Sequence, residues 1–156
     1  MTRTINLKKF VTGLILPVGV FLLSVLSAPG MKSAYAGLEK PPLSPPSWMI
    51  TFVWLTVFLL SGIACYIITD AKTKPGDLTV RLYLAYLAFS FLWTPVFFTL
   101  KWHGLSMVLL VALWAAAFLT MIRFRLTDRL AGNLMVAAVL WVSFLGYINM
   151  AVLFLN

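Results

Sequence analysis

Charged residues are scarce in this chain of 156 residues: they make up 10% of it, and only four of them are acidic. A soluble globular domain usually carries about a quarter charged residues, so most of this surface must face something other than water. The acids Glu39, Asp70, Asp77 and Asp128 all lie outside the long apolar runs, which leaves no carboxylate inside a membrane span for a proton relay. Ion pumps and metal transporters are therefore disfavoured.

Cysteine and histidine each occur once. Cys65 has no partner for a disulfide or for a Cys-ligated metal site, and we expect it to serve in packing. His103 stands in a short connector beside Lys101 and Trp102, where a solvated loop histidine is a simpler interpretation than a haem or metal ligand. The chain also lacks the common phosphate-binding, zinc-binding and Cys-x-x-Cys motifs, so no motif supplies catalytic groups or a metal site.

Apolar sequence is what the chain has in excess: 62% of it is hydrophobic and the mean hydropathy is +1.00. A bilayer core of about 30 Å needs about 20 apolar residues for each helical crossing. Five such runs are present, which predicts an all-α integral membrane protein, a five-helix transmembrane bundle that forms a single domain over residues 1–156. The predicted helices cover about residues 10–28, 48–69, 78–100, 103–122 and 130–154, with a proline-rich connector at 29–47.

The connector contains Pro41-Pro42 and Pro45-Pro46, which cannot continue a helix because proline lacks the amide hydrogen, so a new helix should start at about Trp48. The first run follows a basic start and precedes a small-residue site at residues 33–36, which are also the ingredients of a signal peptide. The length of the run favours a membrane-spanning helix. Whether residues 1–36 are retained or cleaved stays open.

Twelve basic residues give the chain a formal net charge of +8. They fall between the apolar runs and form no patch interleaved with aromatic residues, so nucleic acid is not an expected partner. Nine would lie on one side of the bilayer (Arg3, Lys8, Lys9, Lys72, Lys74, Arg81, Arg123, Arg125, Arg129) and three on the other (Lys32, Lys40, Lys101). Because basic residues are retained on the cytoplasmic side, we predict a bacterial cell membrane protein with its N-terminus in the cytoplasm and its C-terminus outside.

Tryptophan provides the most informative side chains. Trp48 and Trp102 lie near predicted helix ends, where an interfacial belt explains them. The other four, Trp54, Trp93, Trp114 and Trp141, lie deeper, where they either fill helix contacts or stack a flat apolar ligand. Small residues such as Ser61, Gly62 and Ala64 are expected at helix contacts. The best candidates for buried polar groups are Asn149, Ser90 and Ser143.

Three stretches in order resemble the family of tryptophan-rich sensory proteins and translocator proteins (TspO), also called peripheral-type benzodiazepine receptors. They are LEKPPLSPPSWMITFVW at residues 38–54, LAFSFLWTPVFF at 87–98, and LWVSFLGYIN at 140–149 followed by FLN at 154–156. The resemblance covers roughly residues 35–156.

The resemblance implies a five-helix bundle, often a homodimer, with a pocket beneath the first connector that takes tetrapyrroles, sterols and synthetic isoquinolines or benzodiazepines. It implies no required cofactor, with porphyrin or haem as ligand. Trp54 and Trp141 match the two tryptophans thought to lie near bound porphyrin, and they would be the reacting indoles if light-dependent porphyrin breakdown occurs. Carried over by motif or by position, the ligand-binding candidates are Trp54, Phe58, Ser90, Trp93, Phe97, Trp141, Ser143, Gly146 and Tyr147.

Three positions depart from the family pattern. Leu43 stands where many members have a tryptophan in the connector, which predicts a lid that holds ligand less firmly. Ser90 replaces an asparagine and so removes an amide that both donates and accepts hydrogen bonds. Phe154 stands where the proposed cholesterol motif has an arginine, which predicts weak or no cholesterol binding.

The leading hypothesis is a tetrapyrrole-binding membrane protein that senses, buffers or transports protoporphyrin IX or haem, with Lys32, Lys40 or Lys101 meeting the propionates. One alternative is a catalyst that degrades porphyrin under light. Another is a structural or regulatory membrane subunit without a ligand. The sequence leaves open the natural ligand, the choice between transport and sensing, and the oligomeric state.

Overall fold

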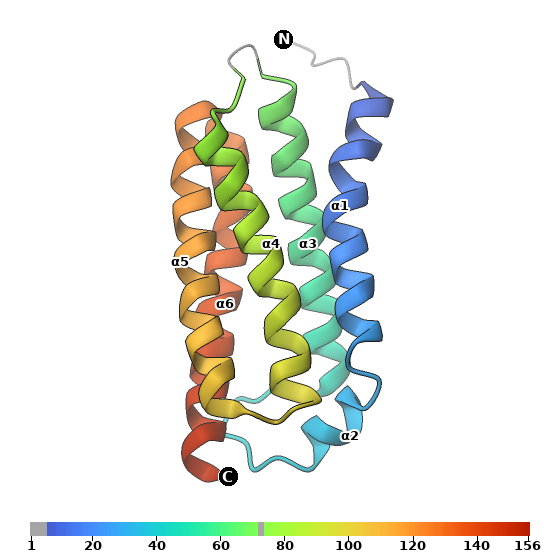
Figure 1. The fold of residues 1–156 in the computed structure, drawn as a ribbon, viewed down its shortest axis with the longest axis vertical. Helices are drawn as coiled ribbons and strands as arrows, with labels where there is room; N and C mark the ends of the chain where they lie inside the picture. Colours follow the sequence, from blue (N-terminus) through green and yellow to red (C-terminus); the bar gives the residue numbers. More distant parts are fainter. Residues whose placement is uncertain (1–5, 72–73) are drawn as a thin grey trace.

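The computed structural model describes residues 6–71 and 74–156, and within them every regular element is a helix (Figure 1). In chain order the helices are α1 (Leu7–Leu26), α2 (Met31–Ala36), α3 (Ser47–Thr69), α4 (Asp77–Phe98), α5 (His103–Thr127) and α6 (Arg129–Leu155). All of these described helices except the short α2 are long and apolar enough to cross a membrane. The predicted all-α bundle of five spanning helices is confirmed.

The proline-rich connector at 29–47 contains a short helix, α2 (Met31–Ala36), that was not among the predicted helices. No proline occurs between Gly30 and Pro41, so nothing in that stretch prevents a helical turn. The end of α2 is stabilised by Lys40, whose Nζ donates to the carbonyl oxygens of Tyr35 and Leu38, both at 2.8 Å. A basic side chain on the last carbonyls of a helix is a common C-terminal cap.

The fourth spanning helix continues beyond its predicted end at residue 122, through the arginines, to Thr127. The next residue, Asp128, has an extended backbone and is the N-cap of α6. The Asp128 carboxylate accepts hydrogen bonds from the amides of Leu130 at 2.8 Å and Ala131 at 3.3 Å. The turn between α5 and α6 is therefore set by an N-cap and not by the change from apolar to basic sequence.

The core lies between α3, α4, α5 and α6, and α1 packs on the outside against α3 and α4 (Figure 1). The start of α1 and the end of α6 lie at opposite ends of the bundle, as an odd number of crossings requires. The segment containing α2 runs beneath the end of the bundle where α4 meets α5 and where α6 ends.

Helices α1 and α3 approach closely at Gly13 and Gly62, in agreement with the small residues expected at helix contacts. A Cβ atom on Gly62 would lie 2.8 Å from Leu14 Cδ2, 2.9 Å from Pro17 Cγ and 3.2 Å from the Gly13 carbonyl oxygen. The proline ring and the backbone oxygen cannot turn away. The position of α1 therefore depends on the missing side chain at Gly62.

We predict that Gly62→Ala lowers the free energy of unfolding by about 1–3 kcal/mol, because the added methyl group forces α1 away from α3. The matched control is Gly19→Ala on α1, where an added Cβ meets nothing within 4 Å. Thermal unfolding in detergent measures both variants. Equal midpoints for Gly62→Ala and Gly19→Ala would contradict the close approach.

Candidate ligand-binding site

Five aromatic rings from three helices pack into one cluster, called here the aromatic cluster: Trp54 and Phe58 from α3, Trp93 and Phe97 from α4, and Trp141 from α6. The centroid of the Trp54 ring lies 5.3 Å from that of Phe58, 6.1 Å from that of Trp93 and 6.4 Å from that of Trp141. Trp93 and Phe97 stack at 5.1 Å. Trp54 and Phe58 are four positions apart on α3, and so are Trp93 and Phe97 on α4. Each pair therefore lies on one face of its helix.

The indole N–H groups of the cluster are in different situations. With the Asn149 amide turned so that both of its polar atoms are satisfied, its oxygen lies 3.2 Å from Trp93 Nε1 and 2.9 Å from Ser106 Oγ, and its nitrogen donates to the His103 carbonyl at 3.3 Å. By contrast, Trp141 is 8% exposed and its Nε1 has no hydrogen-bond partner among the described residues. A buried donor without a partner costs about 1–3 kcal/mol.

The cluster is closed in this structure. The cavity beside Trp54 has a volume of about 20 Å³, which is room for about one water molecule. Its walls include residues that sequence reasoning missed, on α1 (Phe21, Ser24, Val25), on α2 (Met31) and at the end of α4 (Phe98). Phe98 lies inside the stretch 87–98 that carries the resemblance, but no spacing pattern pointed to α1 or α2.

Four of the predicted ligand-binding residues lie outside the aromatic cluster. Ser143 is exposed on the outer surface and accepts a hydrogen bond from Trp114 Nε1 at 2.9 Å. Ser90 is buried, but its hydroxyl donates to the Tyr86 carbonyl within its own helix. Gly146 faces α5, where an added Cβ would lie 3.7 Å from Leu110.

Tyr147 links α6 to the connector. The Phe144 ring lies between the rings of Trp141 and Tyr147, with its centroid 5.7 Å from that of Trp141 and 6.3 Å from that of Tyr147. It is 44% exposed, and its hydroxyl donates to the Pro42 carbonyl at 2.9 Å. Tyr147 therefore lies at the edge of the site and attaches the segment that covers it.

A second attachment joins the connector to α6. The Glu39 amide donates to Asn156 Oδ1, and Asn156 Nδ2 donates back to the Glu39 carbonyl, both at 3.0 Å. Immediately after Pro42, Leu43 is 86% exposed and has a φ of 71°, in the left-handed region that non-glycine residues avoid. The connector from Gly37 to Pro46 is thus a strap with a strained centre, held to α6 by side-chain hydrogen bonds.

Comparison of the sequence with known families shows that the TspO/MBR family matches residues 10–155. This chain belongs to the TspO/MBR family. It is 32% identical over 124 residues to Protein CrtK of Rhodobacter capsulatus, which covers 78% of each chain. It is 32% identical over 146 residues to Tryptophan-rich protein TspO of Chlorobaculum tepidum, covering 92% of each. It is 30% identical over 121 residues to Translocator protein of Homo sapiens, covering 76% of this chain and 72% of the human one.

Membership in the TspO/MBR family confirms the resemblance drawn from the three stretches and supports a multi-pass membrane protein. All three stretches form the site: 38–54 supplies the strap and Trp54, 87–98 supplies Trp93 and Phe97, and 140–149 supplies Trp141 and Tyr147.

Polar side chains of this TspO/MBR protein lie beside the aromatic cluster at the α4–α5 connector, which is called here the mouth of the site. A cavity of about 110 Å³ lies between the α2 segment and the α4–α5 connector, lined by Phe97, Lys101 and His103 among others. His103 was predicted to be a solvated loop residue, but it is the first residue of α5 and is half-buried. Its ring packs edge-on against Phe97 at 5.0 Å and its Nδ1 has no partner within the described chain. On the other side of the strap, burial raises the pKa of the Tyr35 phenol, whose hydroxyl donates to the Pro45 carbonyl.

We predict that Asn149→Ala destabilises the protein by about 1–3 kcal/mol, because Trp93 Nε1 and Ser106 Oγ lose their shared partner inside the bundle. Met150→Ala is the matched control, since Met150 is the next residue on α6 and is exposed. Thermal unfolding in detergent gives both values. A loss no larger for Asn149→Ala than for Met150→Ala would contradict the assigned hydrogen bonds.

Proposed function

We propose that this protein binds tetrapyrroles such as protoporphyrin IX and haem within the membrane, as a sensor, buffer or transporter. The observation that carries the proposal is the aromatic cluster with the unpaired Trp141 N–H at its α6 side. Flat aromatic faces stack on a macrocycle, and an unpaired buried donor gains a partner when a nitrogen- or oxygen-bearing ligand enters.

The propionates of the macrocycle would lie at the mouth of the site. Lys101 lines the 110 Å³ cavity beside Phe97 and is the best-placed cation for them. Lys40 is less suitable, because its ammonium group already donates to backbone carbonyls and lies 5.0 Å from the centre of the Tyr35 ring. Lys32 lines the outer hollow beside Tyr35 and is a secondary candidate.

Binding of a macrocycle requires the site to open. Pockets for ligands of this size have volumes of about 300–1,000 Å³, whereas the cavity beside Trp54 measures about 20 Å³. The strap is not part of a helix and is held by side-chain hydrogen bonds, from Tyr147 of α6, from Asn156 at the end of α6 and from Tyr35 of α2. We infer that the strap moves to admit the ligand.

A second candidate function is light-dependent degradation of porphyrin, with an indole as electron donor to the excited macrocycle. The edge contact between Trp54 and Trp141 favours it, because both indoles would lie within reach of one bound ring. No further cofactor is proposed for either function.

We further propose a bacterial cell membrane protein with a cytoplasmic N-terminus. Lys8, Lys9, Lys74 and Arg81 lie at one end of the bundle with the arginines of the α5–α6 turn, and Lys32, Lys40 and Lys101 lie at the other. Arg3 and Lys72, which the charge count also used, lie outside the described residues.

We also propose a homodimer. Cholesterol binding should be weak or absent, because the exposed Phe154 replaces the basic residue of the motif.

We predict that Trp141→Phe weakens protoporphyrin IX binding about five- to tenfold, because the ligand loses the buried N–H donor. Trp114→Phe is the matched control, since Trp114 lies on the outer surface of the α5–α6 pair. Absorbance titration in detergent in the dark measures both affinities. Unchanged affinity in Trp141→Phe, or an equal loss in Trp114→Phe, would remove the aromatic cluster as the site.

The same samples separate the candidate functions under illumination. Saturable binding without loss of porphyrin absorbance supports a binding or transport role. Bleaching that depends on Trp141 supports the degrading catalyst. Binding that does not saturate, even in the wild-type protein, supports a structural subunit and contradicts the proposal.

We predict that Tyr147→Phe speeds protoporphyrin association severalfold, because the strap loses its bond to the Pro42 carbonyl while the ring remains. Stopped-flow quenching of tryptophan fluorescence measures the rate. Tyr66→Phe is a control that removes a hydroxyl at the opposite end of the bundle. An association rate unchanged by Tyr147→Phe would contradict entry beneath the strap.

A further inference from the structure

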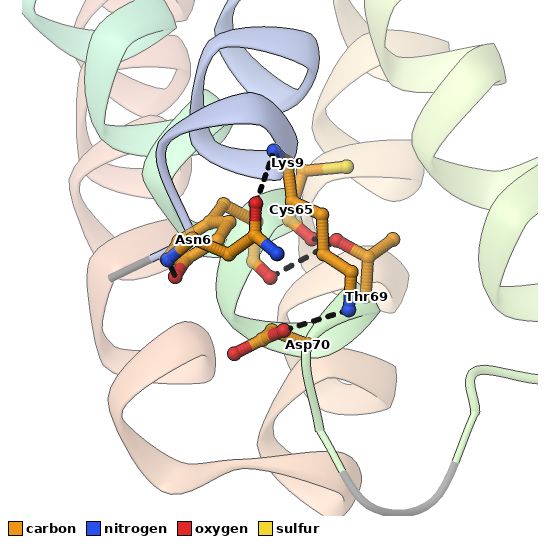
Figure 2. A network of polar contacts seen from close by, with 6 residues as sticks. Asn6, Lys9, Cys65, Thr69 and Asp70 are labelled. Atoms are coloured by element: carbon orange, nitrogen blue, oxygen red, sulfur yellow. Dashed lines mark hydrogen bonds and ion pairs between the residues drawn. The ribbon is translucent and has the colours of Figure 1, made fainter. Parts of the chain in front are cut away.

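A groove lies between the start of α1 and the end of α3, at the end of the bundle opposite the strap. It has a volume of about 360 Å³. Its lining residues are Lys8, Lys9, Thr12 and Gly13 from α1 and Cys65 and Thr69 from α3. Figure 2 shows Lys9 extending past Cys65 and Thr69 toward Asp70.

The walls of the groove offer an occupant little hydrogen bonding. The hydroxyl of Thr12 donates to the Lys8 carbonyl and that of Thr69 to the Cys65 carbonyl, both at 2.7 Å, so both protons are used within their own helices. Gly13 contributes no side chain, and the thiol of Cys65 is a weak donor. Thr12 and Thr69 are exposed on the outer surface, so the groove opens to the surroundings of the bundle.

The rim of the groove carries a net positive charge. Lys9 Nζ forms an ion pair with Asp70 Oδ1 at 2.9 Å, and its side chain remains about half exposed. Lys8 forms no ion pair within residues 6–71 and 74–156. Two ammonium groups and one carboxylate therefore face the rim, and an anionic group placed there would pair with Lys8 and contact the exposed side of Lys9.

The depth of the groove matches the outer part of one bilayer leaflet. From Lys8 to Gly13 the helix rises about 7.5 Å, which is enough to pass from the headgroup region to the first carbons of an acyl chain. A free phosphate ion would use the rim alone, whereas a phospholipid would use both the charged rim and the apolar wall.

We propose that this groove binds one anionic phospholipid, with the phosphate at Lys8 and Lys9 and an acyl chain along the wall formed by Gly13, Cys65 and Thr69. The lipid would fasten α1 to α3 beyond their contact at Gly13 and Gly62. Because Phe21, Ser24 and Val25 of α1 line the cavity beside Trp54, the lipid would also steady one wall of the aromatic cluster. The proposal does not depend on tetrapyrrole binding.

The test uses the full chain in nanodiscs of phosphatidylcholine alone or mixed equally with phosphatidylglycerol. Native mass spectrometry measures the lipid retained on the protein. The rate of alkylation of Cys65 by monobromobimane reports occupancy of the groove, since it is the single cysteine of the chain. Lys8→Gln removes the ammonium group that forms no ion pair with a described residue. Thr12→Phe fills the groove from an exposed position. Lys74→Gln with Arg81→Gln is the control, removing two exposed charges at the same end of the bundle.

We expect the wild-type protein to retain phosphatidylglycerol over phosphatidylcholine and to label more slowly at Cys65 when phosphatidylglycerol is present. Lys8→Gln should lower that retention about fivefold, Thr12→Phe should abolish it, and the control pair should leave it unchanged. Three results would overturn the proposal: no preference for phosphatidylglycerol in the wild-type protein, an equal loss in the control pair, or equal protection of Cys65 by inorganic phosphate.

Discussion

The packing of the Trp54 ring against those of Trp93 and Trp141 is the contact on which the rest of the structure depends, because it joins α3 to both α4 and α6. Rings at separations near 6 Å leave little space between those helices, which accounts for a cavity of only about 20 Å³. The fifth spanning helix, α1, cannot enter this contact and packs outside it. The strap then closes the end where the cluster would otherwise open.

The low dielectric of the bilayer explains where the polar groups lie, since a polar atom there must find its partner within the protein. Asn149 provides that partner for Trp93 and Ser106, and the serine and threonine hydroxyls mostly donate to carbonyls of their own helices. The strap has no helix of its own to satisfy its backbone, and Tyr147 and Asn156 supply partners from α6. Among the described residues, buried polar atoms of Tyr86, His103, Thr120 and Trp141 have no partner. Of these residues, Trp141 belongs to the aromatic cluster and His103 lines the adjoining cavity, where the proposed ligand would supply a partner.

Helix spans follow from the sequence because apolar length is local information, and the spacing of Trp54 with Phe58 and of Trp93 with Phe97 is also local. The same rule applied to α6 places Trp141 and Ser143 about 200° apart around the helix, so Ser143 belongs on the outer surface, where it meets Trp114. Phe21 lines the cavity and Tyr147 bonds the strap only because segments distant in the sequence pack together. The end of α2 is capped by Lys40, which lies outside that helix. The spacing of apolar residues along the sequence does not predict these contacts.

The most direct test of the central claim, that the ligand reaches the aromatic cluster by displacing the strap, is a distance measurement by double electron–electron resonance. Spin labels on Leu43→Cys, at the exposed centre of the strap, and on Trp102→Cys, in the exposed α4–α5 connector, would be placed in a Cys65→Ala background. The account predicts that saturating protoporphyrin IX shifts or broadens the distance distribution between the labels. Saturated binding with an unchanged distribution would contradict it.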